Sequence, residues 1–499
     1  GPNDTHFSDQ WHLNNTGQSG GLRGMDVNIL DAWNLKDAND DFIRGKGIVV
    51  GIVDDGVDYT HNDLYNKFKM ELSLNVCTQE TNPYPYSNAH GTPCACLVGA
   101  QGNNNHGTVG TAPNCNISGL KRYDTCNPTD AQLAALLTHK KDKISIYSNS
   151  WGPSDNGQTL GGAGPLTKRA IRDACENGRQ GKGNIYVWAG GNGLIGNDNS
   201  NKDSYCNDIH TIAVSAIAHT GVQSWFSEPG ANLLIGAPSN GPSTGTGGGI
   251  VTGDVVGSEG YTDSDITYSF GGTSASCPIV AGIIALILQA NPILTWRDVQ
   301  YIVLQSASKN DLSDVDWTNN ISQDSHFIKN EETNVYEYNN ETGYHINHKY
   351  GFGLINATGA VLLAQKWETD NLYVDTLQTI EHIFDVQIDI PDYDNTPEPI
   401  INTIDITETI KIEHIQLIVD IDHTFRGDLK IEITAPSGTK SILIDKHSDS
   451  NNDYSNWNFS SVRHWGESSL GIWTITITDL RISNTGTLQN MKLKLYGVN

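Results

Sequence analysis

Hydrophobic and polar positions follow two different patterns in the two parts of this chain. The first part contains continuous apolar, β-branched runs, of which residues 47–53 (GIVVGIV) are the clearest. A run of this kind predicts a strand of a parallel sheet that is covered on both faces. Similar runs at 144–150 and 184–188 alternate with helical stretches at 130–139 and 166–176. This alternation predicts an α/β domain in which helices flank a mostly parallel sheet on both faces.

Beyond about residue 367, apolar and polar residues alternate with a period of two. The alternation recurs in five segments, at 410–412, 416–419, 429–433, 473–477 and 491–495. Short alternating strands joined by turns such as 436–438 predict an antiparallel β-sandwich or jelly roll. The polar stretch 309–346 predicts loops or a hairpin within the first domain. We therefore expect an α/β domain at 1–366 and an all-β domain at 367–499.

Two apolar runs in the first domain predict buried helices that begin at chemically useful residues. Residues 279–288 (IVAGIIALIL) follow Thr273 and Ser274, and a Thr or Ser before such a run is typical of a helix start. A serine there lies near free backbone N–H groups, which favour a developing negative charge. His90 precedes a second run of small and apolar residues in the same way. Taken alone, either residue is more often structural.

Together with two further polar residues, these positions make up the set that a serine hydrolase needs. Asp54 and Asn192 each follow a predicted strand. The order Asp54, His90, Ser274 matches one of the known chain orders of the Ser-His-Asp triad. In that scheme Ser274 is the nucleophile, His90 accepts its proton, and Asp54 fixes the tautomer of the histidine. Asn192 can donate its amide N–H to the oxyanion, a contribution of about 3–4 kcal/mol.

Composition narrows the partners and the compartment. The chain has 57 acidic and 31 basic residues and a net charge of −26, which argues against nucleic acid or an anionic membrane as partner and fits a cationic ligand. No apolar run is long enough to cross a bilayer and no signal-peptide pattern is present, so we expect a mature or trimmed soluble product. Eight cysteines allow up to four disulfides, with the pairing left open. Sequons that weakly support a secretory origin begin at Asn3, Asn14, Asn116, Asn320, Asn340, Asn356 and Asn458.

These motifs resemble those of the subtilases and, within that group, the kexin/furin-type proprotein convertases. The matching stretches of the first domain are 54–56 (DDG), 90–92 (HGT), 150–153 (SWGP), 191–193 (GNG), 271–275 (GGTSA), 294–300 (LTWRDVQ), 350–354 and 363–367. In the second domain, 426–429, 435–439 and 465–467 resemble the convertase P domain. The resemblance implies a subtilisin-like fold and a secreted, calcium-dependent serine endopeptidase that cleaves after paired basic residues. It also implies that the protein is a glycoprotein and is made as a zymogen. A propeptide or a chaperone is implied as a folding partner.

Carried over to this chain, the resemblance implies a substrate cleft and two calcium sites. Asp155 and Asp203 fall where the family lines the S1 pocket, and Asp55 falls where it meets the basic residue at P2. The remaining cleft residues are Trp151, Gly152 and Pro153. The implied calcium ligands are Asp4, Asp63 and Asn104 in one site and Asp155, Asp198 and Glu228 in the other. Hard carboxylate and amide oxygens of this kind suit Ca²⁺.

Three departures from the family pattern bear on specificity. Pro93 follows the HGT motif where the family usually has Arg, which affects the helix start that supports the histidine. Residues 87–89 (SNA) replace an acidic run, so recognition of a basic P2 residue falls to Asp55 alone. Gly161 and Leu133 stand where furin-like members keep acids for P4, which points to kexin-like dibasic recognition. A subtilase of broader specificity and an inactive subtilase-like binding protein remain as alternatives.

Overall fold

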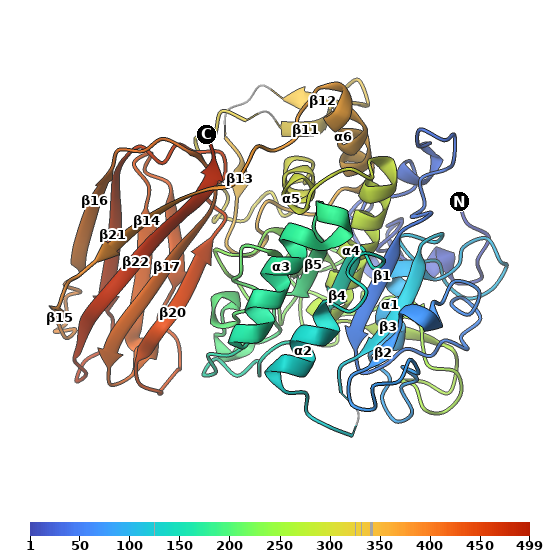
Figure 1. Cartoon of the computed structure of the whole chain (residues 1–499), viewed down its shortest axis with the longest axis horizontal. Coiled ribbons are helices and arrows are strands. Elements are labelled where there is room, and N and C mark those ends of the chain that lie inside the picture. The colour runs from blue at the N-terminus through green and yellow to red at the C-terminus, as the bar shows by residue number, and fades with distance from the viewer. Residues whose placement is uncertain (124, 325, 331, 340–342) are drawn as a thin grey trace.

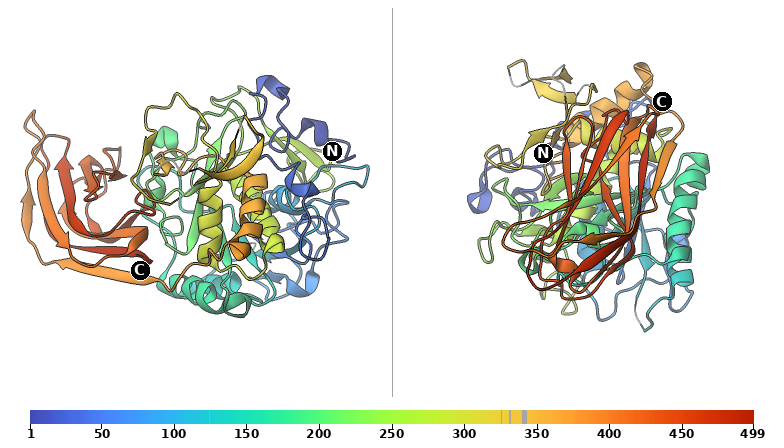
Figure 2. Two further views of the ribbon diagram at one scale, coloured as in Figure 1. Left: turned by 90° about the horizontal axis from the view of Figure 1, so that it is seen from above. Right: turned by 90° about the vertical axis from the view of Figure 1, so that its left-hand side faces the viewer.

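The protein has two domains that pack side by side, as the computed structural model in Figure 1 shows. The structure describes residues 1–499 except 124, 325, 331 and 340–342. The N-terminus and the first domain lie at one end of the molecule, and the second, all-β domain lies at the other (Figure 2). This division confirms the predicted order of an α/β domain followed by a β-sandwich.

The first domain is built on a seven-stranded sheet, in which neighbouring strands are parallel. In spatial order the strands are β2 (Leu74–Asn75), β3 (Asn116–Lys121), β1 (Val49–Asp54), β4 (Ile146–Asn149), β5 (Ile185–Ala189), β6 (Thr211–Ile217) and β7 (Ile235–Pro238). Strands β3 and β4 flank β1, so the order of the chain reverses beside the end of β1. Ligands bind at such switch points, beyond the carboxyl ends of the strands.

Among the described residues, the first domain has six helices around this sheet. They are α1 (Gly91–Gly99), α2 (Asp130–Leu137), α3 (Pro165–Gly181), α4 (Thr273–Ala290), α5 (Trp296–Gln305) and α6 (Ala357–Thr369). Helix α4 packs across β1 and β4 to β7 and against α1 and α6, whereas α2 packs on α3 on the other face (Figure 1). The helices thus hold both faces of the sheet away from water, as the apolar strands require.

Helix α4 is the central helix of the core. Among the described residues it is long and apolar enough to cross a membrane, and 89% of it lies buried inside the protein. The apolar run in the sequence, 279–288, is shorter than this helix, and the reason is the position of the helix start. The helix begins at Thr273, ahead of the apolar run at 279–288, and so includes the small residues between them. Burial on this scale makes α4 a core helix that carries Ser274 in its first turn.

Smaller sheets complete the first domain. They are the hairpin of β8 (Ile250–Gly253) and β9 (Ile266–Phe270), the hairpin of β11 (His326–Asn330) and β12 (Val335–Asn339), and the pair β10 (Thr318–Asn319) and β13 (His345–Ile346). The second of these hairpins confirms the prediction for 309–346. The predicted boundary between 366 and 367 falls within α6 and stays a prediction.

The second domain consists of two packed antiparallel sheets. One has the order β14 (Gln378–Phe384), β22 (Gly486–Val498), β17 (Lys411–His423) and β20 (Tyr454–Ser461), with β15 (Ile388–Ile390) also on β22. The other has the order β16 (Ile400–Ile406), β21 (Gly471–Asp479), β18 (Leu429–Thr434) and β19 (Lys440–Ile444). Apolar side chains at alternate positions, such as Leu417, Val419, Ile431 and Ile433, are buried between them. The period-2 pattern therefore predicts this sandwich correctly.

Buried polar contacts join the two domains. Arg297 of α5 donates through Nε to Glu413 of β17 over 2.8 Å. The side-chain amide of Asn201 donates to the carbonyl of Ser460, and its oxygen accepts from the backbone N–H of the same residue. Trp465 of the second domain belongs to the hydrophobic core of the first. These contacts fix the position of the sandwich on the first domain.

Among the described residues, most cysteines are not in disulfides, and two of the sequon asparagines are buried. Cys77 and Cys126 form a disulfide, and the other six cysteines are free and buried. The side chains of Asn320 and Asn356 are buried and hold backbone groups, so those sequons are structural positions. The sequon at Asn340 lies outside the described residues.

Candidate active site

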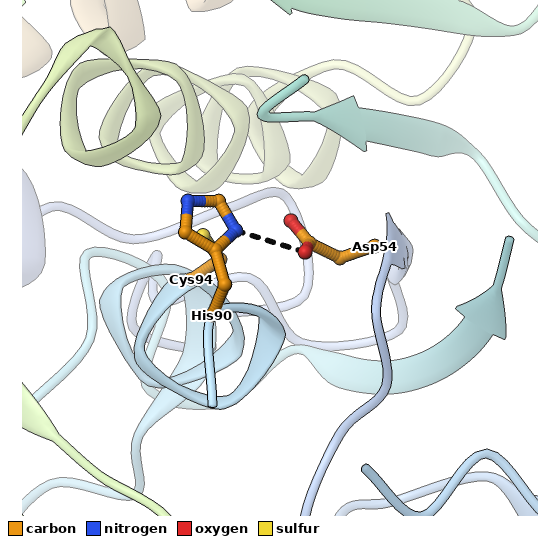
Figure 3. A group of neighbouring side chains, drawn as sticks. All are labelled: Asp54, His90 and Cys94. Carbon is orange, nitrogen blue, oxygen red and sulfur yellow. Dashed lines mark hydrogen bonds and ion pairs between the residues drawn. The ribbon is translucent and has the colours of Figure 1, made fainter. Parts of the chain in front are cut away.

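Asp54 and His90 form a hydrogen-bonded pair at the carboxyl end of β1. Asp54 is the last residue of β1, and His90 immediately precedes α1. The Nδ1 atom of His90 lies 2.8 Å from Oδ1 of Asp54, as Figure 3 shows. This close approach requires Gly91, because a Cβ atom there would lie 2.1 Å from the carbonyl oxygen of Gly56. Burial alone would lower the pKa of His90, but the charge and hydrogen bond of Asp54 raise it to about 9.

Ser274 lies in the first turn of α4. Gly272 enters this turn with a φ of +71°, a conformation that glycine adopts without strain. The Ser274 hydroxyl donates to the carbonyl of Ser150 over 3.4 Å, and no hydrogen bond to His90 is present among the described residues. Before substrate binds, catalytic hydrogen bonds are often long or misaligned. A rotation about χ1 of Ser274 redirects its hydroxyl.

Cys94 lies one helical turn after His90, beside the pair (Figure 3). Its Sγ atom is 3.6 Å from the carbonyl oxygen of Ser274. Atoms of Asp54, His90 and Cys94 that could bind a metal lie within 4.8 Å of one another. Burial raises the pKa of the Cys94 thiol well above its usual value. A thiol that stays protonated is a poor metal ligand, so we assign Cys94 a packing role.

Asn192 is oriented by the start of α4. It follows β5 in a glycine-rich turn, and its Oδ1 atom accepts hydrogen bonds from the backbone N–H and the hydroxyl of Thr273, over 2.8 and 2.9 Å. Because the amide oxygen is engaged in this way, the amide N–H group is left to donate to a ligand. Asn192 and Ser274 line the same pocket, as an oxyanion donor and its nucleophile must.

That pocket contains the acidic residues expected for S1. Its wall is formed by residues 150–155, and four carboxylates line it, those of Asp155, Asp198, Asp203 and Glu228. Burial raises the pKa of Asp203 to about 7, although Tyr205 and Cys206 donate to its carboxylate. A buried carboxylate with a raised pKa gains most from a bound cation. The structure therefore brings the predicted S1 residues and the predicted nucleophile to one cavity.

Three of these acids also fit a calcium ion. Burial, together with the charges of Asp198 and Asp155, raises the pKa of Glu228 well above its usual value. Glu228 accepts one backbone N–H, from Gly193, and Asp198 accepts two, from Gly157 and Asn199. Each carboxylate oxygen has a second lone pair that a hard cation could use, and such a cation would offset the mutual repulsion of the three acids. The donor set Asp155, Asp198 and Glu228 therefore fits Ca²⁺.

The second predicted calcium set is also brought together. Asn104 donates through Nδ2 to Oδ1 of Asp63 over 2.8 Å, and the backbone N–H groups of Asn103 and Asn104 donate to Asp4. The loop closes tightly on Asp63, because a Cβ atom at Gly107 would lie 2.1 Å from its Oδ2 atom. The side chains of Asp4, Asp63 and Asn104, which are far apart in the sequence, thus meet at one loop. Their oxygen atoms suit Ca²⁺ rather than a softer metal.

Asp55 has a structural role that the sequence does not predict. Its two carboxylate oxygens accept hydrogen bonds from the backbone N–H groups of His90, over 3.1 Å, and Gly91, over 2.8 Å. Asp55 therefore caps the start of α1. Burial and the nearby charge of Asp54 raise the pKa of Asp55 to about 6. Pro93 lies in the first turn of the same helix, a position that tolerates proline, and α1 forms around it.

Gly161 and Leu133 are the two residues predicted to weaken the recognition of a basic P4 residue. Gly161 pairs with Asp203 through backbone contacts, and a Cβ atom at Gly161 would lie 2.9 Å from Pro153. Leu133 is buried on α2. Neither residue brings a charge to the cleft, so a basic P4 residue has no acid to meet at these positions.

Two cationic residues near the site are missed by the sequence analysis. Arg122 follows β3 and stacks on Trp151, with its guanidinium carbon 4.1 Å from the ring centre. Lys202 is buried in the wall of the predicted S1 pocket and pairs with Asp449 of the second domain. The strand before Arg122 is a usable signal, because a residue at the end of a neighbouring strand lies near Asp54. The pairing of Lys202 crosses the domains and leaves no local signal.

Family models match both domains. Residues 45–353 match the "Subtilase family" and residues 412–495 match the "Proprotein convertase P-domain". Neuroendocrine convertase 2 of Homo sapiens is 34% identical over 514 residues, which cover 99% of this chain and 74% of that protein. The PC3-like endoprotease variant B of Hydra vulgaris is 37% identical over 490 residues, which cover 96% of this chain. The chain spans 64% of that Hydra protein and 57% of its variant A.

Solved structures agree with this fold. The serine protease of Aeromonas sobria superposes with a TM-score of 0.83 at 23% sequence identity, over 100% of this chain and 96% of that chain. The same protease in complex with its chaperone ORF2 gives a TM-score of 0.82. At this identity the likeness concerns the fold, and it extends over both domains.

Proposed function

Because this chain belongs to the subtilase family of serine endopeptidases and carries a proprotein convertase P-domain, we propose that it hydrolyses peptide bonds in proteins. We propose further that it depends on calcium and cleaves after a basic residue, preferably after a pair of basic residues. One observation carries the proposal: Ser274, Asn192, Asp155 and Asp203 line a single pocket. Nucleophile, oxyanion donor and a receptor for a cationic side chain thus lie together.

The proposed mechanism uses the triad in its ordinary roles. The Ser274 Oγ atom attacks the scissile carbonyl carbon while His90 Nε2 takes its proton, and the Asp54 carboxylate stabilises the imidazolium. The carbonyl oxygen becomes an oxyanion that accepts a hydrogen bond from Asn192. When the C–N bond breaks, His90 returns the proton to the leaving amine and an acyl-enzyme remains. Water then attacks the ester, again with His90 as the base, and releases the acid and Ser274.

Selectivity at P1 follows from the charges at the base of the pocket. A Lys or Arg side chain can pair with Asp203 and Asp155, whereas a neutral side chain leaves a desolvated carboxylate without a partner. Such a loss costs several kcal/mol, so we expect discrimination of about 10²-fold or more. The proposed preference for a second basic residue at P2 rests on Asp55 alone.

Calcium would be held by Asp155, Asp198 and Glu228 in one place and by Asp4, Asp63 and Asn104 in another. When bound, it supplies positive charge that offsets the repulsion among these oxygens and stiffens their loops. In the first site, Asp155 and Asp198 bound in this way keep the wall of the S1 pocket in place. The set Asp4, Asp63 and Asn104 ties the N-terminal segment to a loop of the domain.

We propose that the protein enters the secretory pathway and is secreted. We also propose that it is made as a zymogen. The Cys77–Cys126 disulfide supports an oxidising compartment. A propeptide or chaperone for folding is supported by analogy with the Aeromonas sobria protease, which was crystallised with its chaperone. The sequons that remain accessible support glycosylation. A subtilase of broader specificity is the second candidate, because Asp55 is engaged in capping α1.

The proposal is tested with peptide substrates that differ only at P1. We expect kcat/KM for Arg at P1 to exceed that for Gln by 10²-fold or more, and Ser274→Ala to abolish turnover while the fold is kept. Labelling of Ser274 by an active-site phosphonate separates an enzyme from an inactive binding protein. Equal rates with Arg and Gln at P1 would favour the broader-specificity subtilase, and undiminished turnover of Ser274→Ala would refute the mechanism.

A further inference from the structure

Arg122 lies beside the catalytic pair as a direct result of strand register. Strands β1 and β3 are parallel, and Asp54 is aligned with Lys121. The next residue, Arg122, therefore lies just beyond the sheet edge, and its backbone N–H donates to the carbonyl of Asp54 over 2.8 Å. Side chains alternate along a strand, so the buried side chain of Lys121 and that of Arg122 point to opposite faces. Arg122 points toward Trp151 of the cleft wall.

The positive charge of Arg122 is held in place without a direct ion pair to any carboxylate of the described residues. Its guanidinium stacks on Trp151 with the carbon 4.1 Å from the ring centre. Its Nε atom is buried and has no hydrogen-bond partner in the part of the chain that the structure describes. Burial lowers the pKa of Arg122, and the carboxylates of Asp54 and Asp55 act against this. Arg122, whose side chain is half-buried, thus keeps its positive charge beside the catalytic pair without an ion-pair partner among the described residues.

The P2 side chain of a substrate reaches this part of the cleft. With its P1 side chain in the pocket of Asp203 and its backbone extended, a substrate directs the P2 side chain to the opposite side, toward His90. Asp55 lies there, but both of its oxygens already accept backbone N–H groups of the α1 start. Arg122 stacks on Trp151 and lies close enough to Asp55 for the two charges to interact. A basic P2 side chain would therefore meet the carboxylate of Asp55, whose oxygens already accept hydrogen bonds, and the guanidinium of Arg122, which has no ion-pair partner among the described residues.

We propose that Arg122 is a specificity-determining residue that places a positive charge beside the P2 side chain, so that this enzyme requires a basic P1 residue but not a basic P2 residue. The inference rests on the proposed peptidase function and revises its preference for paired basic sites. Neutral and acidic P2 residues are accepted, because an acidic side chain can pair with the guanidinium. Like charge at P2 is disfavoured, which is a repulsive element of specificity.

The test compares peptides that share Arg at P1 and carry Arg, Gln or Glu at P2. Ratios of kcat/KM are measured within one enzyme preparation, so that the active fraction cancels. For the native protein we expect Arg at P2 to be no better than Gln, and Glu to lie within about tenfold of Gln. A preference of tenfold or more for Arg over Gln at P2 would overturn the proposal, and this measurement needs no variant.

Variants then separate charge from packing. In Arg122→Met, which keeps an apolar side chain on Trp151, the Arg-to-Gln ratio at P2 should rise about tenfold. In Arg122→Lys, which keeps the charge, the ratio should stay within about threefold of the native value. The control Arg172→Met removes an exposed cation from α3 and should leave the ratio unchanged. An unchanged ratio in Arg122→Met, or a rise in Arg122→Lys equal to that in Arg122→Met, would refute the charge effect.

The same peptides distinguish failure of this inference from failure of the proposed function. Each P2 series is also measured with Gln at P1. If Arg at P1 gives no advantage, the proposed selectivity for a basic residue fails, whereas the P2 ratios still report on Arg122. If the P1 advantage holds and the P2 ratios do not respond to Arg122→Met, only the inference fails.

Discussion

A buried ion pair connects the second domain to the wall of the proposed S1 pocket. Lys202 and Asp449 have side-chain exposures of 2% and 0%, and their Nζ and Oδ2 atoms are 2.8 Å apart. Arg426 also donates to Asp449, over 2.7 Å. On the other side, Lys202 donates to the carbonyl of Gly157 and Arg426 to that of Gln158. The second domain thus holds the loop that follows Asp155, which makes this pair a sensitive point of the structure.

Replacing the carboxylate is expected to be costly. At 2.8 Å and an effective dielectric constant of about 20, one pair of charges attracts by about 6 kcal/mol, part of which the loss of hydration offsets. Asp449→Asn leaves Lys202 and Arg426 facing a neutral amide in a buried place. Breaking such a pair typically costs 3–5 kcal/mol, so we expect a loss of about that size in the free energy of unfolding.

The pH dependence of this contribution has a definite sign. Burial alone would raise the pKa of Asp449, but hydrogen bonds from His447, Lys202 and Arg426 hold it well below its usual value. A carboxylate with a depressed pKa in the folded state contributes its stability above the unfolded pKa of about 4. This contribution is lost as the pH falls below that value. The difference between the native protein and Asp449→Asn should therefore shrink in acid.

The assay is guanidinium unfolding in a Ser274→Ala background, which prevents self-digestion. Asp445→Asn serves as a control, because Asp445 is exposed and close in sequence. A double-mutant cycle with Lys202→Met should give a coupling of about 2 kcal/mol or more, since removing both partners leaves less uncompensated charge. In active protein, Asp449→Asn should also raise KM for substrates with Arg at P1. A loss below about 1 kcal/mol, equal to that of Asp445→Asn, would refute this reasoning.

Three further predictions concern the site itself. Asn192→Ala should lower kcat by about 10²–10³ with little change in KM, and a rise in KM alone would mean that Asn192 binds substrate instead. Because His90 must be neutral to accept a proton and its pKa is raised to about 9, kcat/KM should rise with pH up to that region. Asp54→Asn should shift this limb to lower pH and reduce kcat by about 10⁴, as pH–rate profiles of both proteins would reveal. Chelation should lower both activity and Tm, with Ca²⁺ restoring them better than Mg²⁺, and unchanged Tm and rates would exclude a calcium requirement.

The local pattern of the sequence predicts the elements well, and it places the proposed catalytic residues at the ends of these elements. The β-branched run that ends in Asp54 is a strand, and the apolar run after Ser274 is a buried helix. Both elements follow from the local pattern of apolar residues and from helix capping, and these depend mainly on residues that are neighbours in the sequence. The sequence points to Asp54 and Ser274 as candidate catalytic residues because each of them lies at the end of a recognisable element. The period-2 segments predict the second domain for the same reason.

Only the tertiary structure decides what surrounds these residues. Asp55 caps α1, Lys202 pairs with a residue of the other domain, and Arg122 stacks in the cleft. These contacts depend on strand register and domain packing, which join residues far apart in the chain. The sequence alone therefore determines which chemistry this protein carries. The folded structure decides which charges meet the substrate, because electrostatic interactions depend on distance in space and on burial.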